Sequence, residues 1–520
     1  MLLALGLRVY KLAQVPVGLH GDEVGVGYNA YSLLTTGKDE YGVSWPIVLR
    51  ADIPPLNFYL TSLSIDVLGK TDVAVRLPAV VYGVLGVWVT YVLAKKLFSP
   101  QIGILASLFL AISPWHVQAS RIAHEANLGI LLQIVGAIFF LKGLNKKASW
   151  LMGAAVVWGM SLYAYHGPRL TTPLLIIILG IIFRSKLIKL PRKWLVVGGL
   201  GFLLLVLPVA KLILFRPISE NRFAGISILI RQATLKPARD EAKLDAGLSA
   251  VAFHNPILVY SLALGRQYMR YLDWDYLFFD SSQVRYFNVR NVGLMYAWDW
   301  PFLLAGIYYL VRRRKRPASK LALAWLAIAP LPGAVTLGEP NAGRNFMMLP
   351  VVQIITAIGW TGIWKKKWLA GWMKIVLAVG LMYSAAIFGH EYFVHSQQEF
   401  AAQWEYGLKQ AAQVAVVWEN QVDRIIFTDV YKEPYIYVLF YGNKSPAWFN
   451  QLENKQRHWF IGYSSFGKYQ FRAIDWQKDK QLKRSLLVGT AEEIPAGAEG
   501  IVAEIMSPNN QTVVLRVVRT

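Results

Sequence analysis

The chain has 520 residues, of which 55% are hydrophobic and only 16% are charged. A soluble globular protein usually carries about 25% charged residues, so this composition excludes an ordinary soluble chain and predicts an integral membrane protein. The formal net charge is +23, but the basic residues form short runs scattered between apolar segments, which argues against nucleic-acid binding.

Long apolar segments fill most of the first 389 residues. A helix needs about 20 predominantly apolar residues to cross a bilayer. We therefore predict about eleven transmembrane helices, at residues 1–12, 73–97, 101–116, 126–142, 150–166, 169–184, 195–215, 298–312, 320–337, 346–364 and 368–389. The first has only seven residues before Arg8, so it is an incomplete span or a segment at the membrane interface.

Basic clusters predict the orientation of these spans. They follow every second span, at Lys95-Lys96 and at 142–147, 184–193, 312–316 and 365–367. Because consecutive spans cross the membrane in opposite directions, all of these clusters lie on the same side of it. The positive-inside rule assigns that side to the cytoplasm, where anionic lipid headgroups supply the counter-charge. The opposite, extracytoplasmic face then receives loops 13–71 and 216–297 and the tail 390–520.

The tail has the pattern of a small α/β domain outside the membrane. Residues 399–420 place apolar side chains at helical spacing. Short strands are predicted at 423–429, 435–441, 458–463, 484–490, 500–507 and 512–518. The predicted fold class is thus a polytopic α-helical membrane protein, residues 1–389, with a C-terminal extracytoplasmic α/β domain, residues 390–520. The chain has no cysteine, so this domain has no disulfides.

The first external loop carries two acidic pairs, Asp22-Glu23 in HGDEVG and Asp39-Glu40 in TTGKDEYG. One interpretation is structural: Asp22 caps a helix or is simply solvated, and Asp39-Glu40 lies in a solvated turn. The other is functional: Asp22 is a general base at the membrane surface, where neighbouring apolar surface partly desolvates it and raises its proton affinity.

The segment ISPWHVQASRIAHEA, residues 112–126, ends the third predicted span. Arg121 and Glu125 are four residues apart and could pair on one helix face. His116, His124 and Glu125 could instead bind a metal, but their spacing matches no known metal motif. We therefore assign no metal ligand and no required cofactor, and leave a divalent ion as the one open candidate.

Two arginines lie at the outer ends of spans. YAYHGPRL carries Tyr163, His166 and Arg169, and EPNAGRNF carries Arg344 in an external turn. A guanidinium near membrane depth is costly unless it snorkels or finds a partner. Snorkelling explains either arginine alone, but two of them beside an acidic loop favour a phosphate site, since guanidinium binds phosphate in a bidentate manner. DWDYLFFD, residues 273–280, mixes aromatic and acidic residues in a way that suits sugar rings or an interfacial belt.

These segments, in this order, resemble the GT-C membrane glycosyltransferases. The similarity is strongest to the bacterial branch related to protein O-mannosyltransferases and lipid A aminoarabinose transferases (glycosyltransferase family 39). It is carried by GDEVGVGYNAYSLLTTGKDEYG, DVAVRLPAVVYGVLG, ISPWHVQASRIAHEA, YAYHGPRL, DYLFFD and EPNAGR, which together extend over residues 8–390. Members of this family move a sugar from a polyprenyl phosphate to an acceptor on the outer face of the membrane.

The resemblance implies a role for each candidate residue. Asp22 matches the general base, and Glu23 completes the acidic pair. The remaining candidates are assigned to substrate binding: Asp39, Glu40, Arg121, Glu125, Tyr163, His166, Arg169 and Arg344. The reaction would be a single displacement with inversion. The implied partners are a polyprenyl-phosphate sugar donor, membrane lipids and a protein or glycolipid acceptor. The tail does not follow the mannosyltransferase pattern, so the acceptor is not implied.

Two other classes of function stay open at this stage. A transporter or flippase for lipid-linked sugars would carry ionisable residues inside its spans, where Arg76, Lys211 and Lys374 are the main examples. A non-catalytic scaffold that binds a partner through its tail would leave the acidic loop unexplained. An enzyme at the membrane surface accounts for more of the polar residues than either alternative.

Overall fold

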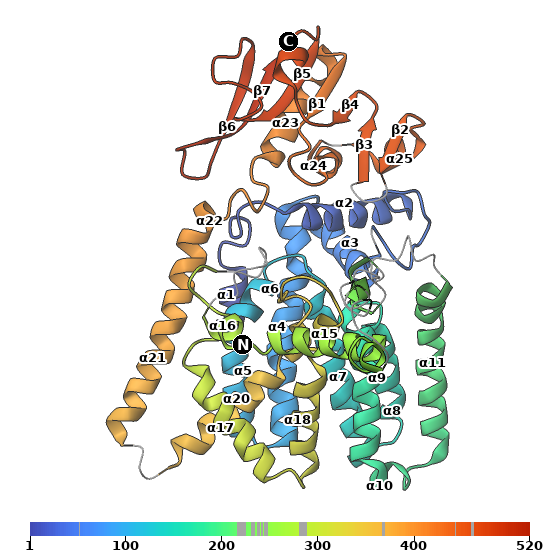
Figure 1. The fold of residues 1–520 in the computed structure, drawn as a ribbon, viewed down its shortest axis with the longest axis vertical. Coiled ribbons are helices and arrows are strands. Elements are labelled where there is room, and N and C mark those ends of the chain that lie inside the picture. The colour runs from blue at the N-terminus through green and yellow to red at the C-terminus, as the bar shows by residue number, and fades with distance from the viewer. Residues whose placement is uncertain are drawn as a thin grey trace.

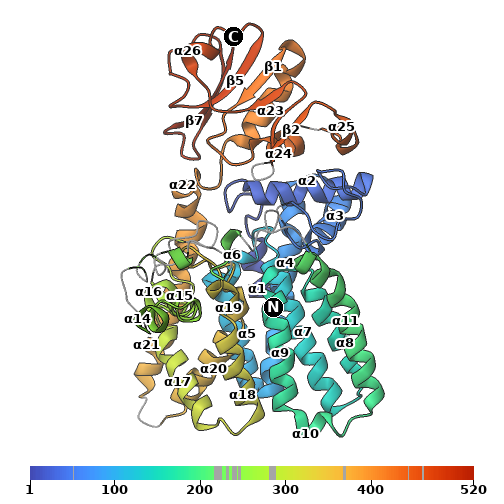
Figure 2. The same ribbon diagram turned by 45° about the vertical axis from the view of Figure 1, so that its right-hand side comes forward.

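A computed structural model describes residues 1–50, 52–215, 225–229, 234–236, 240, 243, 248–279, 289–366, 370–442, 444–458 and 462–520. It consists of a helical bundle with a sheet domain at one end, and the C-terminus lies in that domain (Figure 1). Helix α2 (Gly21–Thr36) lies across the bundle, between the bundle and the sheet domain (Figure 2).

A helix is present at each of the eleven predicted ranges. The first, α1 (Leu2–Val9), has 8 residues and is about 12 Å long, too short to cross a bilayer. The others are α4 (Asp72–Leu97), α5 (Pro100–Ile112), α7 (Ala126–Asn145), α8 (Trp150–Ser161), α9 (His166–Ile182), α11 (Arg192–Phe215), α17 (Asp299–Arg312), α18 (Pro317–Ile328), α20 (Val351–Trp364) and α21 (Gly371–His390).

Five stretches of helix in the described residues are long and apolar enough to span a membrane. They contain α4, α7, α11, α20 together with the preceding turn η2 (Phe346–Met348), and α21 together with its extension to Glu399. The chain is thus a polytopic helical membrane protein. The count of eleven spans stays a prediction, because α5, α8, α9, α17 and α18 are shorter than a full crossing.

The predicted grouping of the basic clusters agrees with the bundle. The α7–α8 turn, the short helix α10 (Arg184–Leu187), the α17–α18 turn and the C-terminal end of α20 all lie at the end away from the sheet domain (Figures 1 and 2). We call this the basic end; Lys367, in the last cluster, lies outside the described residues. That the basic end is cytoplasmic stays a prediction.

The opposite end of the bundle carries short helices and turns, and we call it the outer end. Its helices besides α2 are α3 (Leu56–Leu68), α6 (Pro114–Ala119), α14 (Leu248–Phe253), α15 (Pro256–Arg270), α16 (Trp274–Phe278), α19 (Leu331–Ala334) and α22 (Ser396–Glu399), with the π-helical turn η3 (Glu391–His395). Much of the predicted loop 216–297 lies outside the described residues.

The C-terminal domain contains one seven-stranded sheet in the order β2-β3-β4-β1-β5-β7-β6. Its central strand β1 runs parallel to β4 and β5, and the remaining neighbours are antiparallel. The strands are β1 (Arg424–Phe427), β2 (Lys455–His458), β3 (Gly462–Phe466), β4 (Tyr469–Phe471), β5 (Ser485–Thr490), β6 (Ile501–Met506) and β7 (Val513–Arg519). The helices are α23 (Leu408–Trp418), α24 (Pro434–Tyr441), α25 (Pro446–Gln451) and α26 (Trp476–Asp479), with the turn η4 (Glu419–Gln421).

The predicted strand at 435–441 is wrong, because YIYVLFY forms helix α24. A continuous apolar run cannot be assigned by periodicity alone, and Pro434 at the first helical position favours a helix start. The helix is buried on all sides: every residue from Tyr435 to Phe440 is at most 2% exposed.

The sheet domain and the first external loop share one hydrophobic core. Val24 and Tyr28 of α2 belong to the same buried cluster as Tyr435 and Leu439 of α24. A Cβ at Gly27 would lie 2.8 Å from Val75 and 3.0 Å from Phe440, so α2 is in close contact with the bundle on one side and with the sheet domain on the other. The predicted boundary at residue 390 therefore does not separate two cores.

Helices α17 and α20 cross in close contact through two glycines. A Cβ at Gly306 would lie 2.0 Å from the Ile355 carbonyl oxygen, and one at Gly359 would lie 1.9 Å from the Phe302 carbonyl oxygen. Since both neighbours are backbone atoms, no rotamer change relieves the clash. We expect Gly306→Ala to cost about 1–3 kcal/mol of stability and to lower the unfolding temperature of the detergent-solubilised protein.

The matched control is Gly201→Ala in α11, where nothing lies within 4 Å of the added Cβ. This variant should unfold at or above the wild-type temperature, since alanine favours helix more than glycine does. Equal unfolding temperatures for Gly306→Ala and the wild type would show that the two helices do not cross as closely as described.

Candidate active site

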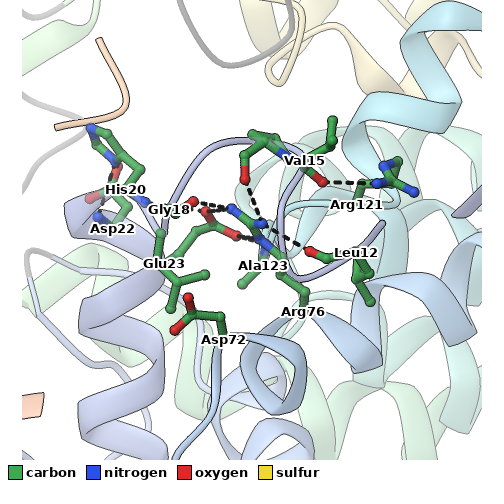
Figure 3. A network of polar contacts seen from close by, with 12 residues as sticks. Leu12, Val15, Gly18, His20, Asp22, Glu23, Asp72, Arg76, Arg121 and Ala123 are labelled. Carbon is green, nitrogen blue, oxygen red and sulfur yellow. Dashed lines mark hydrogen bonds and ion pairs between the residues drawn. The ribbon is translucent and has the colours of Figure 1, made fainter. Parts of the chain in front are cut away.

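A buried ion pair fixes the start of α2. Glu23 accepts hydrogen bonds from Arg76 of α4, at 3.0 Å from Nε and 2.9 Å from Nη2 (Figure 3). The same carboxylate accepts the backbone N–H of His20 at 3.2 Å and of Ala123 at 2.8 Å. Arg76 is 0% exposed and Glu23 is 4% exposed. Four donors satisfy its two oxygens, so Glu23 is held in a structural ion pair and is not positioned as a catalytic partner of Asp22.

Arg76 and Arg121 also hold the connection between α1 and α2. Arg76 donates to the carbonyls of Leu12, Pro16 and Gly18. Arg121 donates to those of Leu7, Arg8, Tyr10 and Val15 at 2.7–2.9 Å. Figure 3 shows both guanidinium groups directed at this connection. The irregular segment between the helices is thereby supplied with donors for its carbonyls, which would otherwise be buried without partners.

The predicted helix-face pair of Arg121 and Glu125 is wrong. Helix α6 ends at Ala119 and α7 begins at Ala126, so both residues lie in the connection between two helices. Arg121 is 0% exposed, and its donors are directed at the backbone carbonyls named above. Its position is that of a structural residue rather than a group that contacts substrate.

Asp22 lies in the first turn of α2 with its side chain 70% exposed. The N-cap is His20, whose Nδ1 accepts the backbone N–H of Asp22 at 3.1 Å. The N-cap interpretation of Asp22 is therefore wrong, and so is the expectation of partial desolvation. In Figure 3 the Asp22 side chain lies beside His20, apart from the Glu23–Arg76 pair. These contacts fix the start of α2, which buries Glu23 and exposes Asp22 to solvent.

The sheet domain contacts this helix start through Glu405. One oxygen of Glu405 accepts the Gly21 N–H and the Tyr437 hydroxyl, both at 2.9 Å. The other lies 3.7 Å from His20 Nε2. A Cβ at Gly21 would lie 2.9 Å from Glu405 Oε2, which explains the glycine. Glu405 is 384 residues from Gly21 along the chain, and no local pattern marks it, so sequence reasoning missed it.

Asp39 and Glu40 are buried, contrary to the solvated-turn interpretation. Asp39 is 2% exposed and its Oδ1 accepts the N–H groups of Tyr41 and Val43. Glu40 is 0% exposed and accepts the Tyr435 hydroxyl at 3.0 Å. Burial raises the pKa of both carboxyls, and the Arg50 charge opposes that rise at Glu40. Asp39 thus bonds within its own loop, and Glu40 joins that loop to the sheet domain.

Arg50 was not predicted from the sequence, yet it lies at the centre of this region. Its guanidinium forms an ion pair with Glu433 and lies 3.7 Å from Glu40. A Cβ at Gly25 would lie only 1.1 Å from Arg50 Nη1, so glycine at 25 lets the arginine pass over α2. Burial acts to lower the pKa of Arg50, but Glu433 and Glu40 raise it above its usual value.

Glu125 is a half-buried acid at the start of α7. Its carboxylate has no hydrogen bond or ion pair with any described residue. Gly129, one turn further on, would place a Cβ 3.0 Å from both Tyr165 and Pro168. Since residues four apart lie on one helix face, Glu125 is directed toward the start of α9. The His124 ring lies 5.5 Å from the Tyr165 ring.

Tyr163, His166 and Arg169 surround the start of α9. The Tyr163 hydroxyl donates to the Leu205 carbonyl of α11 at 2.8 Å. Arg169 donates through Nε to the Leu162 carbonyl at 3.2 Å, and its Nη1 lies 3.2 Å from His166 Nδ1. No carboxylate of the described residues forms an ion pair with Arg169, although the charge of the buried Asp52 acts on it from further away.

Arg344 lies in the turn before η2, which packs against α9. Its Nη1 donates to the Thr336 hydroxyl at 2.8 Å and to the Leu337 carbonyl at 3.1 Å. A Cβ at Gly167 would lie 3.1 Å from Met347, which places this turn beside the start of α9. In the part of the chain that the structure describes, Arg344 also has no carboxylate partner. Two half-buried guanidinium charges at the outer end are thus bonded to neutral groups only.

The three residues considered as metal ligands, His116, His124 and Glu125, do not lie together. His116 is buried and its Nδ1 lies 2.6 Å from Arg8 Nη2, so it is held away from His124 and Glu125. Among the described residues no group of three or more potential ligands is found.

In the aromatic segment 273–280, the rings of Trp274 and Trp300 pack with their centres 4.7 Å apart. Asp280 lies outside the described residues.

Comparison with known proteins supports this architecture. Residues 52–211 match the family of dolichyl-phosphate-mannose-protein mannosyltransferases. The fold is similar to that of ArnT from Cupriavidus metallidurans in the apo state, with a TM-score of 0.56 and 12% identity over 100% of this chain and 96% of that one. The same enzyme bound to undecaprenyl phosphate gives 0.55 and 12%, over 99% and 96%.

A third structure is the archaeal oligosaccharyltransferase AglB from Archaeoglobus fulgidus in complex with an inhibitory peptide and a dolichol-phosphate. Its TM-score is 0.50 at 13% identity, over 85% of this chain and 62% of that one. No curated protein sequence matches significantly. The fold is thus similar to that of GT-C membrane glycosyltransferases, and residues 52–211 match a family of that class, in agreement with the sequence resemblance.

The Glu23–Arg76 pair should be essential for folding. Arg76→Met leaves a buried carboxylate without its counter-charge, and removing one partner of a buried pair costs about 3–5 kcal/mol. We expect a large drop in unfolding temperature or in the yield of folded protein. The double variant Glu23→Leu/Arg76→Met should lose less stability than Arg76→Met alone, since it removes the unpaired charge.

Asp66→Asn, which alters an exposed acid on α3, is the control and should leave the unfolding temperature unchanged. A wild-type unfolding temperature for Arg76→Met would contradict the structural role of the pair.

Proposed function

We propose that the chain is an integral-membrane glycosyltransferase that moves a sugar from a polyprenyl-phosphate donor to an acceptor at the outer end of the bundle. In a cell this end, with the sheet domain, would face away from the cytoplasm, since the basic end is opposite. One observation carries the proposal: Arg169 and Arg344 have no carboxylate partner among the described residues and lie at the same end as the exposed Asp22.

The comparisons support the class of donor. Two of the similar structures contain a bound lipid phosphate, undecaprenyl phosphate in ArnT and dolichol-phosphate in AglB. Arg169 and Arg344 suit such a headgroup because their guanidinium groups retain free donors, and a phosphate would compensate their charge. Tyr163 and His166, at the start of α9, would help to position it.

The reaction is a single displacement at the anomeric carbon. An acceptor hydroxyl or amine attacks C1 of the sugar and passes its proton to the Asp22 carboxylate. The bond between C1 and the phosphate oxygen breaks, and the polyprenyl phosphate leaves with the bonding electrons. The arginines stabilise the negative charge that develops on the phosphate. C1 is inverted, and no covalent enzyme intermediate forms.

The two neighbouring acids would have different tasks. Glu23 and the backbone contact of Glu405 hold the first turn of α2, so that Asp22 is presented on a fixed backbone. Glu125, a half-buried carboxylate without a partner among the described residues, is a second candidate base at the start of α7. Asp39 and Glu40 would act by shaping the loop around Arg50.

The transporter alternative finds less support in the structure. Its three candidate charges do not share an environment: Arg76 is fully buried against Glu23, Lys211 is exposed, and Lys374 lies 5.8 Å from the Trp364 ring centre. None is paired with another along a path through the bundle.

Asp22→Asn should abolish transfer while leaving the fold intact. Loss of a general base lowers the rate by about 10²–10⁴-fold. Membranes carrying the variant would be incubated with radiolabelled polyprenyl-phosphate sugars, and the label moved to acceptor would be counted. Asp66→Asn is the matched control for removing an exposed acid at the same end. Full activity of Asp22→Asn with inactive Glu125→Gln would transfer the role of base to Glu125, and full activity of both would overturn the enzymatic proposal.

Arg169→Gln and Arg344→Gln should weaken donor binding and slow the chemical step. Removing one donor to a developing charge costs about 10²–10³-fold in rate. The matched control is Arg270→Gln, since Arg270 already has a carboxylate partner in Glu339 and should not contact phosphate. Measurement of the donor KM and kcat for all three variants tests the assignment. Equal effects from Arg270→Gln and the two site variants would contradict it.

A further inference from the structure

A second polar site lies at the basic end, far along the bundle from Asp22. Here a pocket of about 330 Å³ opens between the start of α5, the α17–α18 turn and the end of α20. Three cations from different segments line it: Arg313, Arg316 and Lys365. None of the three has a carboxylate partner among the described residues; Lys365 only approaches the Gln101 side chain, at 3.3 Å.

The chain around this pocket lacks any negative charge. Segments 93–104, 305–322 and 354–366 contain no aspartate or glutamate. The start of α5, with Ser99 as N-cap, and the start of α18 both contribute lining residues. Helix starts carry a partial positive charge, so two of them add to the field of the three cations. The pocket therefore favours an anion.

Ser319 adds a hydroxyl group to the polar lining of the pocket. The residue is 2% exposed, and its hydroxyl has no hydrogen bond to a described residue. The positive-inside rule accounts for cations at this end of the spans, but it requires neither a pocket nor an unbonded hydroxyl within one.

Much of the remaining lining is apolar. Leu97, Phe98 and Leu310 line the same pocket. A free phosphate would leave this surface unused, whereas a phospholipid would place its headgroup among the cations and its chains along the apolar residues.

We propose that this pocket binds the phosphate of an anionic phospholipid from the leaflet at the basic end. The lipid would join α5, α17, α18 and α20 at their ends. Because the pocket is at the opposite end of the bundle from the proposed catalytic residues, lipid binding should be unaffected in Asp22→Asn. Failure of one proposal therefore does not entail failure of the other.

The test is native mass spectrometry of the full-length protein in detergent, titrated with phosphatidylglycerol or phosphatidylcholine. We expect preferential retention of one phosphatidylglycerol. Arg313→Gln/Arg316→Gln should weaken its binding by roughly tenfold or more, since each cation near a membrane surface contributes about 1 kcal/mol toward an anionic lipid. The matched control is Arg314→Gln/Lys315→Gln, which removes the same charge from the same turn but from residues that do not line the pocket.

The unfolding temperature of each variant, recorded without lipid, checks that it is folded. Equal binding of the two lipids by the wild type, which needs no variant, would overturn the proposal. So would equal losses in the test and control variants, which would indicate surface charge alone. Competition by inorganic phosphate as strong as that by phosphatidylglycerol would overturn the lipid assignment in favour of a free-phosphate site.

Discussion

The buried ion pair between Glu23 and Arg76 is the interaction on which the outer end of this protein depends. It joins the start of α2 to a membrane helix and, through the Ala123 N–H, to the segment after α6. Consecutive residues on a helix point in directions about 100° apart. As a result Glu23 faces the interior while Asp22 faces solvent, so two adjacent acids have opposite environments and different roles.

Buried arginines build the surrounding scaffold. Arg8, Arg76 and Arg121 are all 0% exposed, and each donates to several backbone carbonyls. A guanidinium has five donors in a fixed plane, so one side chain can satisfy an irregular segment that forms no regular hydrogen-bonding pattern of its own. Substituting lysine would keep the charge but lose that geometry.

The two ends of the bundle use positive charge differently. At the outer end, Arg50 and Arg76 are neutralised by Glu433, Glu40 and Glu23, while Arg169 and Arg344 form no ion pair with a described carboxylate. At the basic end, cations gather without any carboxylate in the neighbouring segments. The first arrangement suits a transient substrate, and the second suits a resident lipid.

The sequence alone determined that this is a membrane protein, where its helices lie along the chain, and that the basic clusters share one end of the bundle. Long apolar runs and basic flanks are local properties of the chain, so they can be recognised without the fold. The sequence also singled out Asp22, Arg169 and Arg344, since each lies beside a span end. Only the tertiary structure decided which polar residues are bonded to one another. Glu23 meets Arg76 across 53 residues and Gly21 meets Glu405 across 384, and the run YIYVLFY became a helix through burial between α2 and the sheet. Such contacts arise from packing of distant segments, for which the local pattern of residues carries no signal.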